Sequence, residues 1–187
     1  MADKFQATIR VAHLSDAALL AELGARTFAE TFAKDNTPED MAAYLRSSFS
    51  HEQMQSELRD KSCSFLIAEV ENEPAGYALM RTSDAPEMIF GKSSIEIVRF
   101  YVSSEWHGQG IANALMHECV SQAIQGGYES IWLGVWEHNE RAQAFYRKWN
   151  FKPIGMHPFE LGSDLQNDIV MERVIASELT FTSTSPG

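Results

Sequence analysis

One stretch of the chain, residues 94–136, constrains the fold more than any other. SIEIVRFYV (94–102) is rich in β-branched and aromatic residues and alternates in polarity, as a strand does. Residues 109–125 carry apolar side chains at helical spacing, and Gly126-Gly127 ends that pattern. IWLGVW (131–136) is an almost continuously apolar strand, of the kind found in the middle of a covered sheet. This order of elements predicts a mixed α/β protein.

The segments on either side of this stretch fit the same class. Their apolar periodicity, helix-capping residues and turn residues predict further helices, a β-hairpin and two more strands. These elements are helices over 15–33, from Thr37 and from Ser50, the hairpin strands 63–70 and 75–82 around Glu71-Asn72-Glu73-Pro74, a helix over 139–149, and strands near 151–156 and 167–174.

The chain has 187 residues, a length that suits one domain. We expect a single domain over residues 1–175, since neither a repeat nor a linker interrupts the pattern. Residues 176–187, ASELTFTSTSPG, have one charge and no apolar pattern, so we expect a disordered tail.

The charge of the chain is strongly acidic. Fifteen Lys and Arg against 26 Asp and Glu give a net charge of −11. Nucleic acids and anionic membranes need clustered cations, so we expect neither as a partner. An acidic field favours cationic partners, although it also simply aids solubility. No signal peptide or membrane span is predicted, and Cys63 and Cys119 fit neither a disulfide framework nor a zinc site, so we expect a cytoplasmic protein.

The junction between the strand at 94–102 and the helix at 109–125 reads SSEWHGQGIANAL (103–115). Gly108 and Gly110 lie where the helix begins, and the first N–H groups of a helix have no intrahelical acceptor. Small residues let a phosphate approach those groups, and the helix dipole adds positive potential. The junction indicates a phosphate-binding loop, although a glycine turn before a helix is also common without a ligand.

Two familiar phosphate motifs do not fit this loop. A dinucleotide fingerprint needs a third glycine where Asn113 stands, and a Walker A loop needs G-x-x-x-x-G-K-S/T. His107-x-x-Gly110-x-Ala112 instead resembles the pyrophosphate loop of the GNAT acetyltransferases, Q/R-x-x-G-x-G/A. His107 departs from the usual Gln or Arg, but an imidazole can also donate to a phosphate.

Residues 131–151, IWLGVWEHNERAQAFYRKWNF, resemble the second signature of the GNAT family. Asn150 stands where the family usually has glycine, and asparagine also tolerates the left-handed backbone of a helix end. Together the two signatures identify the chain as a member of the GNAT superfamily. FAETFAKDNTPEDMAAYL (28–45), together with IWLGVWEHNERAQAFY (131–146), looks like the bacterial spermidine/spermine N-acetyltransferase branch. The resemblance implies a mixed, mostly antiparallel central sheet with splayed parallel strands in the middle, flanked by helices.

The same resemblance implies acetyl-CoA as co-substrate. It places the backbone of Val102 and the side chain of Asn139 on the pantetheine arm, and Lys148 near the phosphates. Tyr146 lies beside the sulfur and donates a proton to the departing thiolate, unless it is only a packed aromatic. The residues expected to hold the phosphates are His107, Gly108, Gln109, Gly110, Ile111 and Ala112. The remaining histidines have no metal-ligand spacing, so we expect no metal.

Glu96 is the expected general base. An alkyl ammonium has a pKa near 10 and must lose a proton before its nitrogen attacks a thioester carbonyl. A period of two places Glu96 and Val102 on the same face of one strand. In some GNAT enzymes a glutamate at this strand position acts directly or through water. The alternative is a surface carboxylate, or one that is ion-paired with Arg99.

The expected function is acetyl transfer to a primary amine, a polyamine such as spermidine or spermine, by direct attack in a ternary complex. The segment 28–45 and a loop at 157–166 are expected to form the acceptor wall, with carboxylates such as Glu30 and Glu160. Two alternatives stay open: a protein N-terminus or lysine as acceptor, and a non-catalytic acyl-CoA-binding regulator. The regulator should have lost Tyr146 or the strand glutamate. A homodimer is common in the family.

Overall fold

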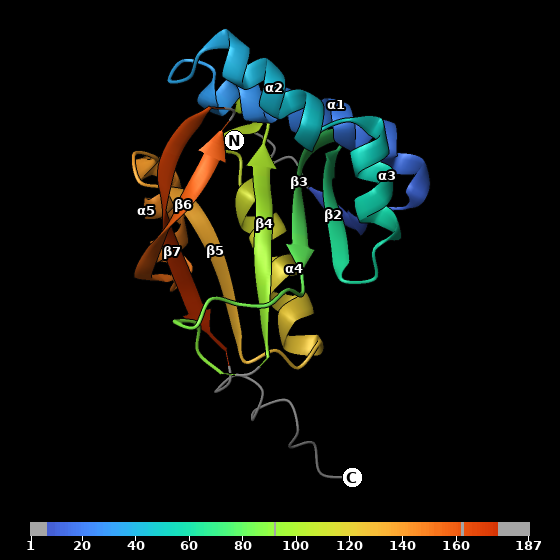
Figure 1. Cartoon of the computed structure of the whole chain (residues 1–187). Helices are drawn as coiled ribbons and strands as arrows, with labels where there is room; N and C mark the ends of the chain where they lie inside the picture. Colours follow the sequence, from blue (N-terminus) through green and yellow to red (C-terminus); the bar gives the residue numbers. More distant parts are fainter. Residues whose placement is uncertain (1–6, 92, 162, 176–187) are drawn as a thin grey trace. The chain divides into compact units, whose positions relative to one another are not determined.

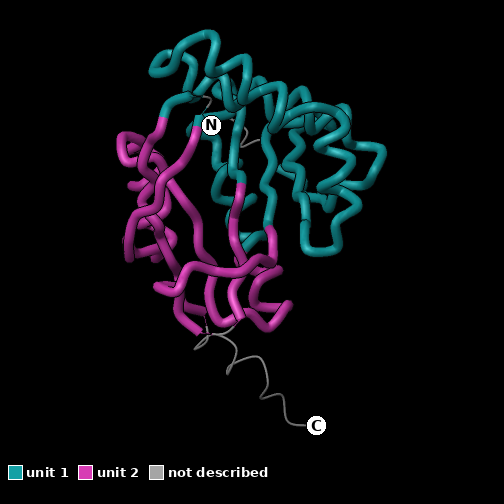
Figure 2. The backbone as a smooth tube through the Cα atoms, viewed as in Figure 1, with its two compact units in different colours: residues 1–80, 99–119, 161–164 teal, residues 81–98, 120–160, 165–187 magenta. Residues whose placement is uncertain are grey.

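The computed structural model describes residues 7–91, 93–161 and 163–175. The chain divides into two compact units (Figure 2): unit 1 comprises residues 1–80, 99–119 and 161–164, and unit 2 comprises residues 81–98, 120–160 and 165–187. The expected disorder of residues 176–187 lies outside the described residues, and the single domain over 1–175 stays a prediction.

Seven strands form a mixed sheet in the order β1–β2–β3–β4–β5–β7–β6 (Figure 1). β4 and β5 are parallel, whereas the pairs β1–β2 and β5–β7 are antiparallel. The strands are β1 (Thr8–Val11), β2 (Cys63–Val70), β3 (Glu73–Arg81), β4 (Ser94–Val102), β5 (Ser130–Trp136), β6 (Lys152–Leu161) and β7 (Asp164–Val174). The α/β class and the mixed sheet are confirmed, while the short edge strand β1 was not predicted.

The turn between β2 and β3 is shorter than predicted. Glu71 and Asn72 have φ of 53° and 68°. Positive φ at two successive residues is typical of a two-residue hairpin turn. β3 therefore begins at Glu73, two residues before the predicted start.

The helices begin at the predicted capping residues. The Thr37 hydroxyl accepts a hydrogen bond from the Asp40 N–H at 3.2 Å, and the Ser50 hydroxyl accepts one from Gln53 at 3.1 Å. The predicted helix over 15–33 starts with a 3₁₀ turn. The helical elements are η1 (Leu14–Asp16), α1 (Ala17–Phe32), α2 (Pro38–Ser48), α3 (His51–Arg59), η2 (Ser104–Trp106), α4 (Ile111–Gln125) and α5 (Glu140–Lys148).

Helix α4 buries the apolar stripe that its sequence predicts. Leu115, Met116 and Cys119 are fully buried. Burial also raises the pKa of the Cys119 thiol, because the thiolate would lose its hydration. Cys119 is therefore a packed, inert thiol. None of the described helices has the length and the apolar character that a membrane crossing requires.

The C-terminal strands of the described chain are longer than predicted. β6 extends through residue 161 and β7 starts at residue 164, so most of residues 157–166 is strand. The predicted acceptor loop at 157–166 is wrong. Gly155 and Pro158 resemble strand breakers in the sequence, yet β6 continues through both with alternating exposure.

Candidate active site

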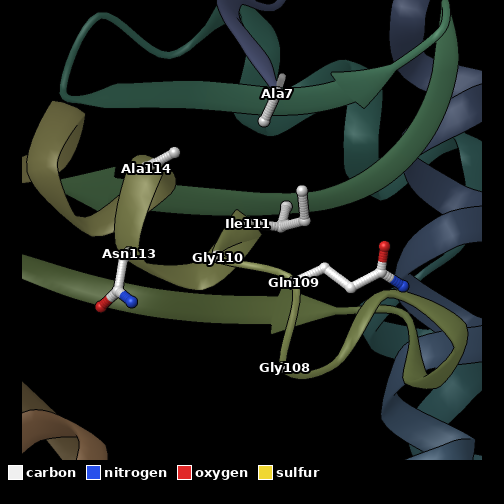
Figure 3. Close-up of a pocket in the computed structure, with 7 residues that line it drawn as sticks. All are labelled: Ala7, Gly108, Gln109, Gly110, Ile111, Asn113 and Ala114. Atoms are coloured by element: carbon white, nitrogen blue, oxygen red, sulfur yellow. The ribbon is translucent and has the colours of Figure 1, made fainter. Parts of the chain in front are cut away.

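A pocket in unit 1 lies at the start of α4. Its volume is about 400 Å³, and it is lined by Ala7, Gly108, Gln109, Gly110, Ile111, Asn113 and Ala114 (Figure 3). The Ala114 N–H donates to the Gly110 carbonyl at 3.0 Å, so helical hydrogen bonding starts at Gly110. The N–H groups of Ile111 and Ala112 belong to the first turn, which has no intrahelical acceptors. The pocket therefore suits an anionic ligand.

Two glycines shape the backbone of this pocket. Gly108 has φ +79° and Gly110 has φ +90°, in the left-handed region that favours glycine. A Cβ atom at either residue would meet nothing within 4 Å. Backbone conformation, rather than crowding, therefore selects glycine at both positions, and the absence of side chains leaves the backbone open to a ligand.

His107 fixes the end of β4 through its side chain. Its Nε2 lies 2.8 Å from the Val102 carbonyl oxygen. A carbonyl only accepts, so Nε2 carries the proton in this contact. In the neutral imidazole the other nitrogen is then an acceptor. The His107 side chain can therefore donate to a phosphate only in its protonated form, which limits the role predicted for it.

A glycine on β3 permits the close approach of the end of β4. A Cβ atom at Gly76 would lie 2.6 Å from the Tyr101 carbonyl oxygen and 3.0 Å from the Val102 Cα. The Ser103 N–H also donates to the Ala75 carbonyl at 2.9 Å. Gly76 thus positions Val102. A glycine inside a strand pattern was the signal that could have revealed it.

Helix α1 supports the loop that follows β4. A Glu30 carboxylate oxygen accepts the Ser104 N–H at 2.9 Å, and Arg26 donates to the Ser103 hydroxyl at 3.2 Å. Glu30 was expected in the acceptor wall, but its carboxylate is engaged by the backbone of this loop.

Helix α5 carries three predicted site residues in unit 2. The Asn139 side-chain oxygen accepts the Ala142 N–H at 3.1 Å and caps the helix, which leaves its amide NH₂ as the donor group. Tyr146 is buried, with its ring centroid 5.9 Å from that of Phe151. Lys148 is exposed in the last turn. Asn150 has φ 65°, so it adopts the left-handed conformation expected where the family has glycine.

Glu96 is ion-paired, but not with the arginine that the sequence suggested. Arg81 Nη2 lies 3.3 Å from Glu96 Oε2, and the Ser83 hydroxyl donates to the same oxygen at 3.3 Å. Arg99 instead pairs with Glu57 at 2.6 Å. Arg81 and Ser83 therefore hold the Glu96 carboxylate in place on β4.

Three carboxylates share one face of the strands in unit 2. The strand register places Glu96 and Glu172 opposite Trp132, and Asp168 opposite Trp136. Glu172 accepts the Phe90 N–H at 2.7 Å. Asp168 has no hydrogen-bond or ion-pair partner among the described side chains, and burial raises its pKa to about 6, partly offset by His157. No sequence motif marks Asp168; only the register reveals it.

The predicted site residues fall into two groups. Unit 1 brings together the end of β4 and the glycine loop: Val102, His107, Gly108, Gln109, Gly110, Ile111 and Ala112. Unit 2 holds Glu96, Asn139, Tyr146 and Lys148. Their roles toward ligands stay predictions. Over the described residues, no group of three His, Cys, Asp or Glu side chains is arranged to hold a metal ion.

Proteins of known family resemble this chain over most of its length. An uncharacterized N-acetyltransferase of Mycobacterium tuberculosis is 34% identical over 160 residues, which are 86% of this chain and 98% of that protein. Another, from Lactobacillus delbrueckii subsp. lactis, is 32% identical over 149 residues, 80% of this chain and 86% of that protein.

Solved structures share the fold at lower identity. The PaiA N-acetyltransferase of Thermoplasma acidophilum, in complex with coenzyme A, matches with a TM-score of 0.74 at 20% identity, over 90% of this chain and 99% of that one. The ribosomal-protein-S18-alanine N-acetyltransferase of Escherichia coli matches with a TM-score of 0.67 at 16% identity, over 91% and 95%.

The family model for the acetyltransferase (GNAT) family matches residues 25–151. This range includes the glycine loop, the strand that carries Glu96, and helix α5. The chain belongs to the acetyltransferase (GNAT) family and is an acetyl-CoA-dependent N-acetyltransferase.

Proposed function

We propose that the protein acetylates a primary amine of a polyamine such as spermidine or spermine. The observation that carries this proposal is the pair of partly buried carboxylates on one face of unit 2, Glu96 and Asp168. A polyamine is a series of ammonium groups joined by methylenes. Carboxylates attract the ammonium groups, and the half-buried indole of Trp136 on the same face offers apolar and cation–π contacts.

The pocket of unit 1 fits the other substrate. Acetyl-CoA brings a pyrophosphate and an activated thioester, and the open backbone at Gly108 and Gly110 suits the phosphates. In this proposal, Val102 and Asn139 bind the pantetheine arm and Lys148 lies near the phosphates. Because Gly108, Gly110 and the first turn of α4 supply N–H groups rather than cations, an acidic chain can still bind this polyanion.

The chemistry requires two proton transfers. Glu96 takes a proton from the substrate ammonium, directly or through water, and the free amine then attacks the thioester carbonyl. The C–N bond forms, the C–S bond breaks, and Tyr146 donates its phenolic proton to the thiolate. The attacking nitrogen loses a second proton, which restores the Tyr146 phenol. The products are the acetylated amine and CoA with a protonated thiol.

The acceptor class is tested by the release of CoA from acetyl-CoA. The panel contains spermidine, spermine, an aminoglycoside and peptides with a free N-terminus. We expect turnover with the polyamines. Turnover with peptides only would refute the polyamine acceptor, and silence across the panel would favour the non-catalytic regulator.

The role of Tyr146 is tested separately. In Tyr146→Phe we expect kcat to fall about 100-fold, the usual scale for losing a general acid, while the Kd for acetyl-CoA stays unchanged. Tyr128→Phe is a matched control in the same unit, since it removes a hydroxyl that contacts only Thr82 at 2.9 Å in the described structure. An unchanged rate in Tyr146→Phe would remove Tyr146 from the mechanism.

A further inference from the structure

One nitrogen of the His107 imidazole is engaged by the backbone of unit 1. Nε2 lies 2.8 Å from the Val102 carbonyl oxygen, and this contact requires a proton on Nε2, because a carbonyl only accepts. In the neutral ring Nδ1 then carries a lone pair, which cannot donate to a phosphate oxygen. In the protonated ring both nitrogens donate, so Nδ1 becomes a charged N–H donor while the contact with Val102 is kept.

The second nitrogen of His107 lies close to the backbone that borders the pocket of unit 1. Nδ1 is bonded to Cγ, so it stays within a few bonds of the His107 backbone in every rotamer. Gly108, the next residue, lines the pocket of about 400 Å³ at the start of α4 (Figure 3). Gly108 has no side chain that could separate the exposed imidazole from an anion in the pocket. A protonated His107 can therefore add a charged donor to the backbone N–H groups of the loop.

The charged groups on the elements that contact this loop belong to residue types that keep their charge near neutral pH. Helix α1 brings Arg26 and Glu30: Glu30 accepts the Ser104 N–H at 2.9 Å, and Arg26 pairs with Glu105 of η2 at 3.5 Å. Carboxylates and guanidinium groups do not ordinarily titrate between about pH 5.5 and about pH 8.5, whereas an imidazole does. Among these groups, a change in charge near neutral pH therefore belongs to His107.

We propose that protonated His107 binds a phosphate oxygen of CoA through Nδ1, so that CoA binding is coupled to the uptake of a proton. The anion stabilises the imidazolium, and because the coupling between two binding events is reciprocal, protonation of His107 strengthens CoA binding. Nε2 holds the Val102 carbonyl in both states and keeps the end of β4 in place. This inference rests on the proposed placement of the phosphates at the glycine loop, and it is independent of the acceptor amine.

The test is the Kd of dephospho-CoA, measured by calorimetry on the whole protein between about pH 5.5 and about pH 8.5. Dephospho-CoA keeps the pyrophosphate but lacks the phosphate monoester of CoA, whose own ionisation near about pH 6 would obscure that of the histidine. In the wild type we expect the Kd to rise about ten-fold from the lowest to the highest pH, the scale of one hydrogen bond to a charged group. Titrations in two buffers of different ionisation enthalpy should also show that binding near neutral pH takes up protons.

Three variants separate His107 from the other histidines. His107→Gln replaces the imidazole by a donor that does not titrate, so its Kd should not vary with pH and its binding should take up no proton. His107→Arg carries a permanent charge, so its Kd should also be independent of pH but match that of the wild type at low pH. His117→Gln is the matched control, since it removes an exposed histidine of α4, and it should keep the pH dependence and the proton uptake of the wild type.

A wild-type Kd that varies less than two-fold over this pH range, or a pH dependence that persists unchanged in His107→Gln, overturns the proposal. Gly110→Ala tests the placement of the phosphates separately, because it disturbs the loop backbone at φ +90° and leaves the imidazole in the chain. If Gly110→Ala weakens the binding of dephospho-CoA while pH has no effect on the wild type, the loop holds the phosphates and the histidine contact is refuted. A Kd in Gly110→Ala equal to that of the wild type refutes the placement of the phosphates, and the proposal with it.

Discussion

Replacing Asp168 by asparagine should stabilise the protein at neutral pH. The Asp168 carboxylate is ionised above its pKa of about 6, yet it is partly buried and has no hydrogen-bond or ion-pair partner in the described part of the chain. In the unfolded chain the same group has its ordinary pKa of 3.8. The folded state therefore carries a charge that the unfolded state hydrates better, and Asp168→Asn removes this cost.

The shift in the Asp168 pKa sets the size of the expected gain in stability. The interval between about 6 and 3.8 corresponds to about 3 kcal/mol at about 1.4 kcal/mol per pKa unit. Partial exposure of the carboxylate to solvent reduces this to about 1–2 kcal/mol. The free energy of unfolding of Asp168→Asn should exceed that of the wild type by this amount at pH 7.5.

The direction of the Asp168 pKa shift also determines how the stability difference depends on pH. Between pH 6 and 3.8 the folded state binds more protons at Asp168 than the unfolded state, so lowering the pH favours folding at this site. The penalty is complete above pH 6 and disappears as the pH falls toward 3.8. The advantage of Asp168→Asn should therefore shrink to near zero at about pH 4.

The assay is urea denaturation followed by tryptophan fluorescence, at pH 7.5 and at several lower values. Asp84→Asn, which neutralises an exposed aspartate of the same unit, is the control, and we expect a change within about 0.5 kcal/mol. A variant Asp168→Asn that is less stable at pH 7.5, or whose difference from wild type does not vary with pH, would refute the reasoning.

Three further changes test other parts of the structure. Gly110→Ala forces an alanine into φ +90° and should cost about 1–2 kcal/mol of stability and weaken CoA binding in calorimetry, whereas Gly127→Ala, at φ +73° after α4, should cost similar stability with the Kd for CoA unchanged. Glu57→Ala breaks a buried ion pair with Arg99, whose two side chains are each 11% exposed, and should lower the free energy of unfolding by about 3–5 kcal/mol. Asp35→Asn, which breaks an exposed pair with Lys34, should change it by less than about 1 kcal/mol. The KM for spermidine should rise with ionic strength between low salt and about 0.5 M, because salt screens the attraction of the acidic chain.

The fold was readable from the sequence wherever local signals and burial agree. The apolar stripe of α4, the caps at Thr37 and Ser50 and the strand over 94–102 all depend on residues close in the chain. The predictions fail where contacts between residues far apart in the sequence determine the structure. Residues 157–166 contain turn-forming residues, but pairing between strands holds most of them extended.

The candidate site divides in the same way. The glycine loop and helix α5 are each contiguous, so their resemblance to the family signatures was enough to predict them, and their roles toward ligands stay predictions. The alternative to the general-base role of Glu96 was an ion pair with Arg99, a neighbour in sequence, but Arg81 on β3 is the actual partner. Asp168 and His157 meet only because β5, β6 and β7 place three separate residues around one point, and a single sequence contains no information on strand register at that distance.

The net charge of −11 has different consequences for the two substrates. Acetyl-CoA is a polyanion, and in the proposed binding mode the loop at Gly108 and Gly110 meets it with backbone N–H groups, whose number does not depend on the charge of the chain. The acceptor is proposed to be a cation, and the carboxylates on the face of unit 2 are matched to it. A chain that bound CoA through lysines would place cations against its own second substrate. Recognition of phosphate by backbone therefore leaves the side chains free to be acidic, which accounts for an acetyl-CoA enzyme with so few cations in its phosphate loop.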